Sequence, residues 1–100
     1  MNDFEENWWL MYSSFPDLNW ARLRVFQSGK SEVFDMDGKT SNFVSKSDAI
    51  NSLLEDEYIS YNAISPEDEI EYDINLKEIE VPKSESDVEL VGLMYRQKNA

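Results

Sequence analysis

The sequence predicts an α+β domain, in which an antiparallel β-sheet arranged as a meander packs against at least one α-helix. Three observations predict this class. Apolar and polar residues alternate at 20–27, an Asp-Gly pair divides a hairpin expected at 32–44, and apolar residues at helical spacing follow at about 46–57. The chain has 100 residues, the size of a single domain. We therefore expect one domain over residues 1–100, ending in a frayed basic tail at 96–100.

Two strands are expected in the first third of the chain. The first is the bulky segment 7–13, in which the adjacent Trp8 and Trp9 must point to opposite faces of a strand. We expect one of these two side chains to belong to the core. In the second strand, 20–27, apolar and basic side chains alternate: Ala21, Leu23 and Val25 on one face, Arg22 and Arg24 on the other.

Asp37-Gly38 is the clearest turn signal in the sequence. An Asp-Gly pair suits a two-residue type I′ loop, because glycine adopts its positive φ angles without steric cost. Such a loop would pair Phe34 with Ser41. Phe34, Met36 and Phe43 would then share one face of the hairpin, as expected for a half-buried sheet.

A helix is expected at about 46–57. Ser45 is a suitable N-cap, and Asp48 lies where a carboxylate favours the first turn. The helix would bury an apolar stripe formed by Ala49, Ile50, Leu53 and Leu54. Three acidic residues crowd its C-terminal end, where the helix dipole disfavours negative charge: Glu55, Asp56 and Glu57. Such a local conflict can mark a functional surface.

The second half of the chain is expected to add two strands and one ambiguous segment. Residues 58–64 would form a short strand. Residues 67–76 would form another, because apolar and acidic residues alternate there, the apolar ones being Ile70, Tyr72, Ile74 and Leu76. Residues 87–95 fit either a helix or a strand. As a helix, this segment would be capped by Ser86 and would bury Val88, Val91 and Met94.

The composition excludes most catalytic chemistry. The chain has no cysteine and no histidine, so disulfides, thiolate nucleophiles, imidazole bases and cysteine or histidine zinc sites are ruled out. The run 35–38 resembles the start of a calcium loop, but that loop would begin at Val33 and end at Val44, which carry no carboxylate. Carboxylate pairs are too common in this chain to indicate an active site. We expect no enzyme, no metal site and no cofactor.

The ends and apolar runs of the sequence bear on its location. The first residues are acidic, whereas a signal peptide begins with basic residues. The longest apolar run, from Trp8 to Met11, is too short to cross a bilayer. We therefore expect a cytoplasmic protein that does not bind membranes.

Acidic residues are concentrated in one part of the chain. The net charge is −12, and residues 47–76 hold nine acidic residues and no lysine or arginine. Such a charge disfavours nucleic acid as a partner and favours a protein with a basic surface. Tyrosines within this span could add contact area. The candidate partner-binding residues are Glu55, Asp56, Glu57, Tyr58, Tyr61, Glu67, Asp68, Glu69, Glu71 and Asp73.

Three stretches of the sequence resemble a known class of proteins. They are Asp37-Gly38-Lys39-Thr40, the segment 53–59 with the sequence LLEDEYI, and the segment 89–95 with the sequence ELVGLMY. With its size and acidity, the chain resembles small acidic bacterial immunity proteins, in particular those of contact-dependent growth inhibition systems. The resemblance implies a cytoplasmic protein that binds the C-terminal toxin domain of a sibling cell's effector and blocks it. Such toxins are often nucleases with basic active sites.

Two other functions remain open on the sequence. The chain could be a nucleic-acid mimic that inhibits a DNA-binding enzyme, in which case its carboxylates should form a regular extended stripe. It could also be a structural or adaptor domain, whose acidic residues serve only solubility and are spread evenly over the surface. The sequence does not predict the oligomeric state.

Overall fold

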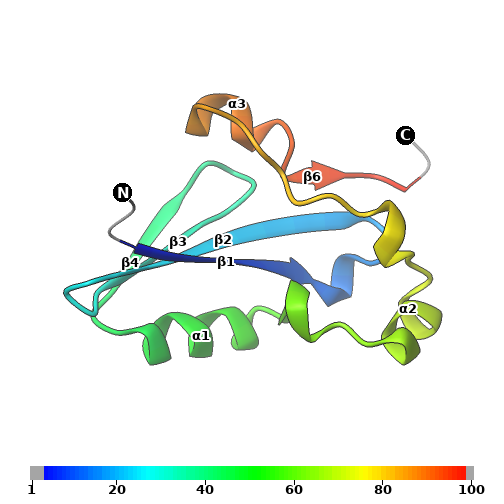
Figure 1. Ribbon diagram of the computed structural model, residues 1–100, viewed down its shortest axis with the longest axis horizontal. Coiled ribbons are helices and arrows are strands. Elements are labelled where there is room, and N and C mark those ends of the chain that lie inside the picture. The colour runs from blue at the N-terminus through cyan, green and yellow to red at the C-terminus, as the bar shows by residue number, and fades with distance from the viewer. Residues whose placement is uncertain (1–3, 99–100) are drawn as a thin grey trace.

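The antiparallel sheet predicted from the sequence lies at the centre of the molecule (Figure 1). The computed structural model describes residues 4–98. Its strands are β1 (Phe4–Met11), β2 (Leu18–Phe26), β3 (Ser31–Phe34), β4 (Thr40–Phe43), β5 (Tyr58–Ser60) and β6 (Tyr95–Arg96). Five strands follow the order β4-β3-β2-β1-β5, and β6 pairs with the start of β2. With helices packed on this sheet, the predicted α+β class is confirmed.

Three α-helices lie on the two sides of the sheet. α1 (Lys46–Glu55) and α2 (Pro66–Tyr72) lie below it in Figure 1, and α3 (Asp87–Val91) lies above it. Short 3₁₀ turns occupy Tyr12–Ser14, Tyr61–Ala63 and Leu76–Glu78. The helix predicted at 46–57 is confirmed as α1, although it ends at Glu55. The Ser45 hydroxyl caps it by accepting a hydrogen bond from the Asp48 amide at 3.2 Å.

The alternation of side chains along β1 and β2 divides the core into two clusters. The cluster on the α1 side contains Trp9, Ala21, Leu23, Ala49, Leu53 and Tyr58. The cluster on the α3 side contains Leu10, Trp20, Phe34, Ile64, Ile79, Leu90 and Met94. The adjacent tryptophans point to opposite faces, as predicted. Trp9 is buried on the α1 side, and Trp8 packs edge-on against Trp20 on the other, with ring centroids 5.9 Å apart.

The hairpin at 32–44 is present, but its predicted register is wrong by one residue. Phe34 pairs with Thr40 rather than with Ser41. The Gly38 amide donates to the Asp35 carbonyl at 3.0 Å, and Gly38 has a φ of 78°, so the loop contains three residues and closes on a left-handed glycine. Since a shift of one residue reverses the face of every side chain, Phe43 packs on the α1 side, away from Phe34.

Residues 67–76 were predicted as a strand and form α2 and a 3₁₀ turn instead. Ser65 and Asp68 make a capping box: the Asp68 amide donates to the Ser65 hydroxyl at 3.2 Å, and the Ser65 amide donates to the Asp68 carboxylate at 2.9 Å. Pro66 begins the helix at a position that needs no amide partner. These start signals outweigh the alternation of apolar and acidic residues that suggested a strand.

The remaining predictions for the second half are confirmed in part. The strand expected at 58–64 ends at Ser60. The ambiguous segment begins as a helix, α3, capped by Ser86 through a hydrogen bond from the Glu89 amide at 3.2 Å. Met94 is fully buried as expected, but Val88 is 88% exposed and Leu90 occupies the buried position of the helix. The expectation that Val88 is buried was therefore wrong.

The tail predicted to fray at 96–100 is held at its beginning. Arg96 pairs with Leu18 across β6 and β2. The Lys98 amide donates to the Asp17 carboxylate at 3.1 Å, and the Lys98 ammonium contacts the Asp73 carboxylate at 2.6 Å. These contacts hold residues 96–98 against the domain, and fraying of the tail stays a prediction. Residues 99–100 lie outside the described residues.

Candidate partner-binding surface

The acidic end of α1 is exposed, as its sequence predicted. Glu55 is the last helical residue, and Asp56 follows it as the C-cap. Glu57 has a φ of 67°, a left-handed conformation that turns the chain from α1 into β5. In the part of the chain that the structure describes, these three carboxylates make neither an ion pair nor a side-chain hydrogen bond. The three carboxylates are therefore exposed to solvent without a partner in the described chain.

The acidic residues of α2 fall into two groups. Asp68 belongs to the capping box, Glu69 accepts a hydrogen bond from the Leu76 amide at 2.7 Å, and Asp73 pairs with Lys98. These three side chains hold the local structure. Glu67 and Glu71 are exposed and have no such partner among residues 4–98. Only the second group lacks a side-chain partner among the described residues.

Tyr58 is buried, which corrects its predicted role in partner binding, whereas Tyr61 is partly buried and keeps some of its surface in solvent. Tyr58 is only 7% exposed and packs beneath α1. Burial, with the nearby charges of Asp35 and Asp56, raises the pKa of its hydroxyl to about 12. Tyr61 packs against Trp20, with ring centroids 5.4 Å apart, and its hydroxyl donates to the Ile79 carbonyl at 3.4 Å. Both tyrosines therefore stabilise the fold.

Three other aromatic rings join the two acidic segments. The ring centroids of Phe15 and Tyr72 are 4.9 Å apart, and those of Tyr12 and Tyr72 are 6.2 Å apart. Tyr12 also donates its amide to the Glu57 carbonyl at 2.8 Å, which places the cluster beside the end of α1. All three rings are half-buried and keep part of their surface in solvent. The sequence contained these aromatics, but only the fold brings residues 12 and 15 to residue 72.

The charges next to Tyr72 affect its titration. Partial burial raises the pKa of the Tyr72 hydroxyl, and the neighbouring carboxylates of Glu71 and Asp68 raise it further. The ring therefore lies within the negative field of α2. A cation brought to this ring would meet both its π face and these carboxylates.

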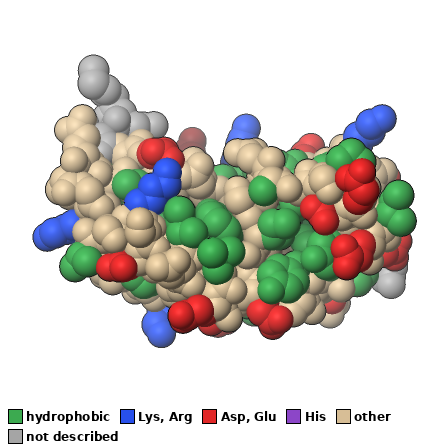
Figure 2. Space-filling view, turned by 90° about the horizontal axis from the view of Figure 1, so that it is seen from below, with side chains coloured by type: hydrophobic (Ala, Val, Ile, Leu, Met, Phe, Trp, Pro, Cys, Tyr) green, Lys and Arg blue, Asp and Glu red, His purple; other side chains and the backbone are tan. Residues whose placement is uncertain are grey.

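Two aliphatic side chains complete the surface. Ile70 is 85% exposed on α2 between Glu67 and Glu71, and Leu54 is 55% exposed next to Glu55. Figure 2 views this side of the molecule and shows hydrophobic side chains gathered among Asp and Glu side chains. We name this region the acidic aromatic surface. It comprises Tyr12, Phe15, Leu54, Glu55, Asp56, Glu57, Glu67, Ile70, Glu71 and Tyr72.

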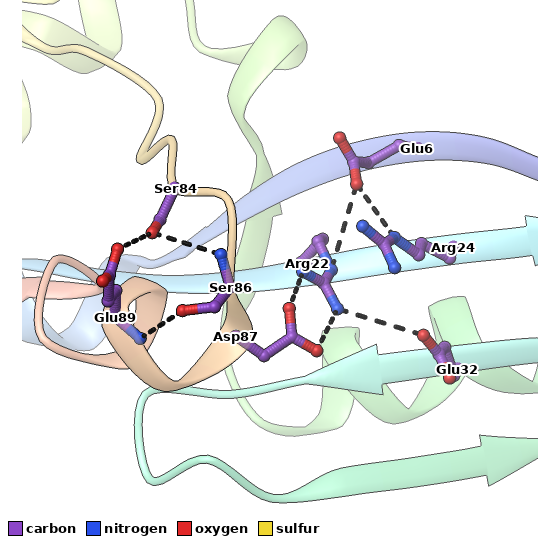
Figure 3. Close-up of polar contacts among 8 residues, drawn as sticks. All are labelled: Glu6, Arg22, Arg24, Glu32, Ser84, Ser86, Asp87 and Glu89. Atoms are coloured by element: carbon purple, nitrogen blue, oxygen red, sulfur yellow. Dashed lines mark hydrogen bonds and ion pairs between the residues drawn. The ribbon is translucent and has the colours of Figure 1, made fainter. Parts of the chain in front are cut away.

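A second group of acidic residues, on the α3 side, is paired with arginine (Figure 3). Arg22 is 3% exposed and donates to the Asp87 carboxylate at 2.9 Å. Glu6 and Glu32 lie 3.9 and 4.0 Å from its guanidinium, and Arg24 contacts Glu6 at 2.9 Å. The hydrogen bond from Arg22 lowers the pKa of Asp87, although partial burial opposes this. In this group the carboxylates compensate the positive charge of the buried Arg22 guanidinium.

Among residues 4–98, no three acidic side chains converge to hold a metal ion. The same residues contain no helix that is long and apolar enough to cross a membrane. No protein-family model, curated protein or solved structure matches the chain. The geometry of the acidic aromatic surface is thus the main guide to function.

Proposed function

We propose that this protein is an immunity protein, a stoichiometric inhibitor that binds a basic toxin domain through the acidic aromatic surface. The observation that carries the proposal is that five exposed carboxylates without partners among residues 4–98 lie beside half-buried aromatic rings and exposed aliphatic side chains. The sequence resemblance to immunity proteins of contact-dependent growth inhibition supports the same class. A nuclease is the toxin that fits best, because its active site must attract phosphate and is therefore basic.

The unpaired carboxylates would serve the encounter with the toxin. Like charges at Glu55, Asp56 and Glu57 repel one another, and the dipole at the end of α1 adds to the cost. A field of one sign attracts a partner of the opposite sign and raises its association rate. This function gives a reason for an arrangement that reduces the stability of the protein alone.

The apolar part of the surface would supply most of the contact energy. Interfaces are held by a few central aromatic or aliphatic side chains, surrounded by polar residues that exclude water. Ile70 and the Tyr72 ring are suited to the centre, with Glu67 and Glu71 at the rim. Arginine side chains of the toxin could stack on the rings while pairing with the carboxylates.

The alternative of a nucleic-acid mimic is less well supported. A mimic needs carboxylates at regular, phosphate-like spacing, whereas aromatic rings separate the acids of α1 from those of α2. We expect competition with nucleic acid only as a consequence of covering the toxin's active site.

The proposal is tested with the toxin domain encoded beside this gene. The two purified proteins should form a 1:1 complex by size-exclusion chromatography with light scattering, and the toxin's activity should fall in proportion to the inhibitor added. Substituting Ile70→Asp should weaken the complex, and Val88→Asp, an equally exposed position on α3, should not. A neighbouring toxin that is not bound, or the absence of any toxin gene nearby, would contradict the proposal.

A further inference from the structure

A groove lies on the side of the sheet away from α1 and α2. It has a volume of about 840 Å³ and runs between β6 and the extended segment 80–83. Trp20, a core residue, forms part of its floor, and the exposed Leu93 and Tyr95 form part of its wall. In Figure 1 the segment and β6 both lie above β2, close to the C-terminal end of the described chain.

Both walls of this groove offer unpaired main chain. β6 pairs with β2 along one edge, and within residues 4–98 no strand covers its other edge. No backbone hydrogen bond joins residues 80–83 to another described segment, so the amides of Val81 and Lys83 are available, whereas Pro82 has no amide to donate. Extended backbone with free amides and carbonyls is a template for an additional strand.

The charges of the groove differ from those of the rest of the molecule. Lys83 and Arg96 line it, and neither forms an ion pair with a described residue. Glu80 is the only acidic residue in its lining. In a protein with a net charge of −12, this is a local excess of positive charge.

We propose that this groove binds an extended segment of a partner protein in which apolar and acidic residues alternate. The peptide backbone would pair with β6 and with segment 80–83. Its apolar side chains would contact the exposed Leu93 and Tyr95, and its carboxylates would pair with Lys83 and Arg96. This mode of recognition takes its affinity from main-chain hydrogen bonds and its specificity from alternate side chains.

In Figure 1, α1 and α2, which carry most of the acidic aromatic surface, lie below the sheet, and β6 and segment 80–83, which line the groove, lie above it. The acidic aromatic surface and the groove also favour opposite charges, since one gathers unpaired acids and the other unpaired cations. A peptide in the groove would therefore leave the acidic aromatic surface accessible. The proposal does not rest on the function inferred above, and either one can fail alone.

The test uses the full chain, labelled with ¹⁵N, and a short capped peptide of alternating valine and glutamate. Adding this peptide should shift the amide resonances of Val81, Tyr95 and Gln97 and slow their hydrogen exchange. Arg96→Glu should weaken binding by about fivefold or more, since a favourable charge pair becomes a repulsive one. Because Arg96 belongs to β6, its substitution also changes that strand, and a second variant is needed. Lys83→Glu lies outside any strand and should weaken binding to a similar extent. Lys30→Glu makes the same kind of charge change in the turn between β2 and β3, outside the lining of the groove; it is the matched control and should not weaken binding.

Two further peptides separate strand addition from simple charge attraction. A peptide with lysine in place of glutamate should bind more weakly, and one with alternate amides N-methylated should not bind. Equal binding of either peptide would overturn the proposal. It would also be overturned by shifts confined to other regions, or by concentration-dependent shifts of these amides without peptide, which would assign the groove to a second copy of the chain.

Discussion

The acidic residues around Arg22 and those of the acidic aromatic surface have different physical settings. Around Arg22, three carboxylates lie within 4.0 Å of a guanidinium that is almost fully buried. On the acidic aromatic surface, five carboxylates have no ion-pair partner among the described residues and lie beside half-buried rings. The first arrangement stabilises the fold, because a buried cation without partners is costly. The second arrangement adds repulsion between like charges, and the proposed binding of a basic partner would give a reason for it.

The largest effect we expect concerns Tyr58, the tyrosine that burial removes from the surface. Its folded-state pKa of about 12 exceeds the ordinary 10.0, so the folded state keeps its proton where the unfolded state loses it. The resulting stability is present below pH 10 and is lost as the pH rises towards 12. We expect a loss on the order of 2 kcal/mol, measured by urea unfolding across this range.

Tyr58→Phe provides the control for this pH dependence. The variant has no hydroxyl to titrate, so its free energy of unfolding should fall less steeply between pH 10 and 12. A slope equal to that of the wild type would show that Tyr58 ionises as easily in the folded protein as in the unfolded chain.

The next effect compares the two acidic regions directly. Asp87→Ala removes the closest partner of buried Arg22 and should cost about 1–2 kcal/mol of unfolding free energy, because Glu6 and Glu32 compensate only in part. Glu71→Ala, on the acidic aromatic surface, should change stability by less than about 0.5 kcal/mol. Urea unfolding of the two variants at neutral pH measures both. Equal losses would remove the distinction on which the comparison rests.

A smaller effect on the free energy of unfolding is expected at acidic pH. The pKa of Asp87 lies below 3.8 in the folded state, so the carboxylate contributes stability above that pH and loses it as the pH falls further. Unfolding free energies measured from neutral to acidic pH should therefore fall less for Asp87→Asn than for the wild type. A parallel decrease in both proteins would place the acid-sensitive groups elsewhere.

The smallest effect has the opposite sign. Replacing Glu55 and Glu57 by glutamine removes repulsion at the C-terminal end of α1, where the helix dipole also disfavours negative charge, and we expect a gain of about a few tenths of a kcal/mol at low salt. High salt should abolish the gain, because it screens exposed charges. Thermal unfolding at two salt concentrations measures this. Destabilisation by the double substitution would indicate that these acids have a structural partner.

Much of the fold was predictable because its signals are local. Alternation along 20–27 correctly separated Leu23 from Arg22, and Ser45 correctly marked the start of α1. The hairpin register was not predictable from Asp37-Gly38 alone, since the same pair fits two-residue and three-residue loops. For α2, the sequence contains the capping residues Ser65 and Asp68, but the period-two pattern after them predicts a strand where the helix forms.

The candidate surface was predictable only in part. Charge correctly identified Glu55, Glu67 and Glu71 as exposed, because an unpaired carboxylate cannot be buried without a large cost. Aromatic side chains are stable in either environment, so the sequence could not separate Tyr58, which is buried, from Tyr72, which is half-exposed. That choice depends on which segments the fold brings together.

The most direct test of the proposed function is the association rate of the protein with its toxin at several salt concentrations, measured by stopped-flow fluorescence. We expect the wild-type rate to fall steeply as salt rises. At low salt, Glu71→Lys should slow association by about tenfold and flatten the salt dependence. Glu85→Lys makes the same charge change in the exposed loop before α3 and should have a much smaller effect. A rate insensitive to salt, or equal effects of the two substitutions, would contradict the assignment of the acidic aromatic surface as the binding site.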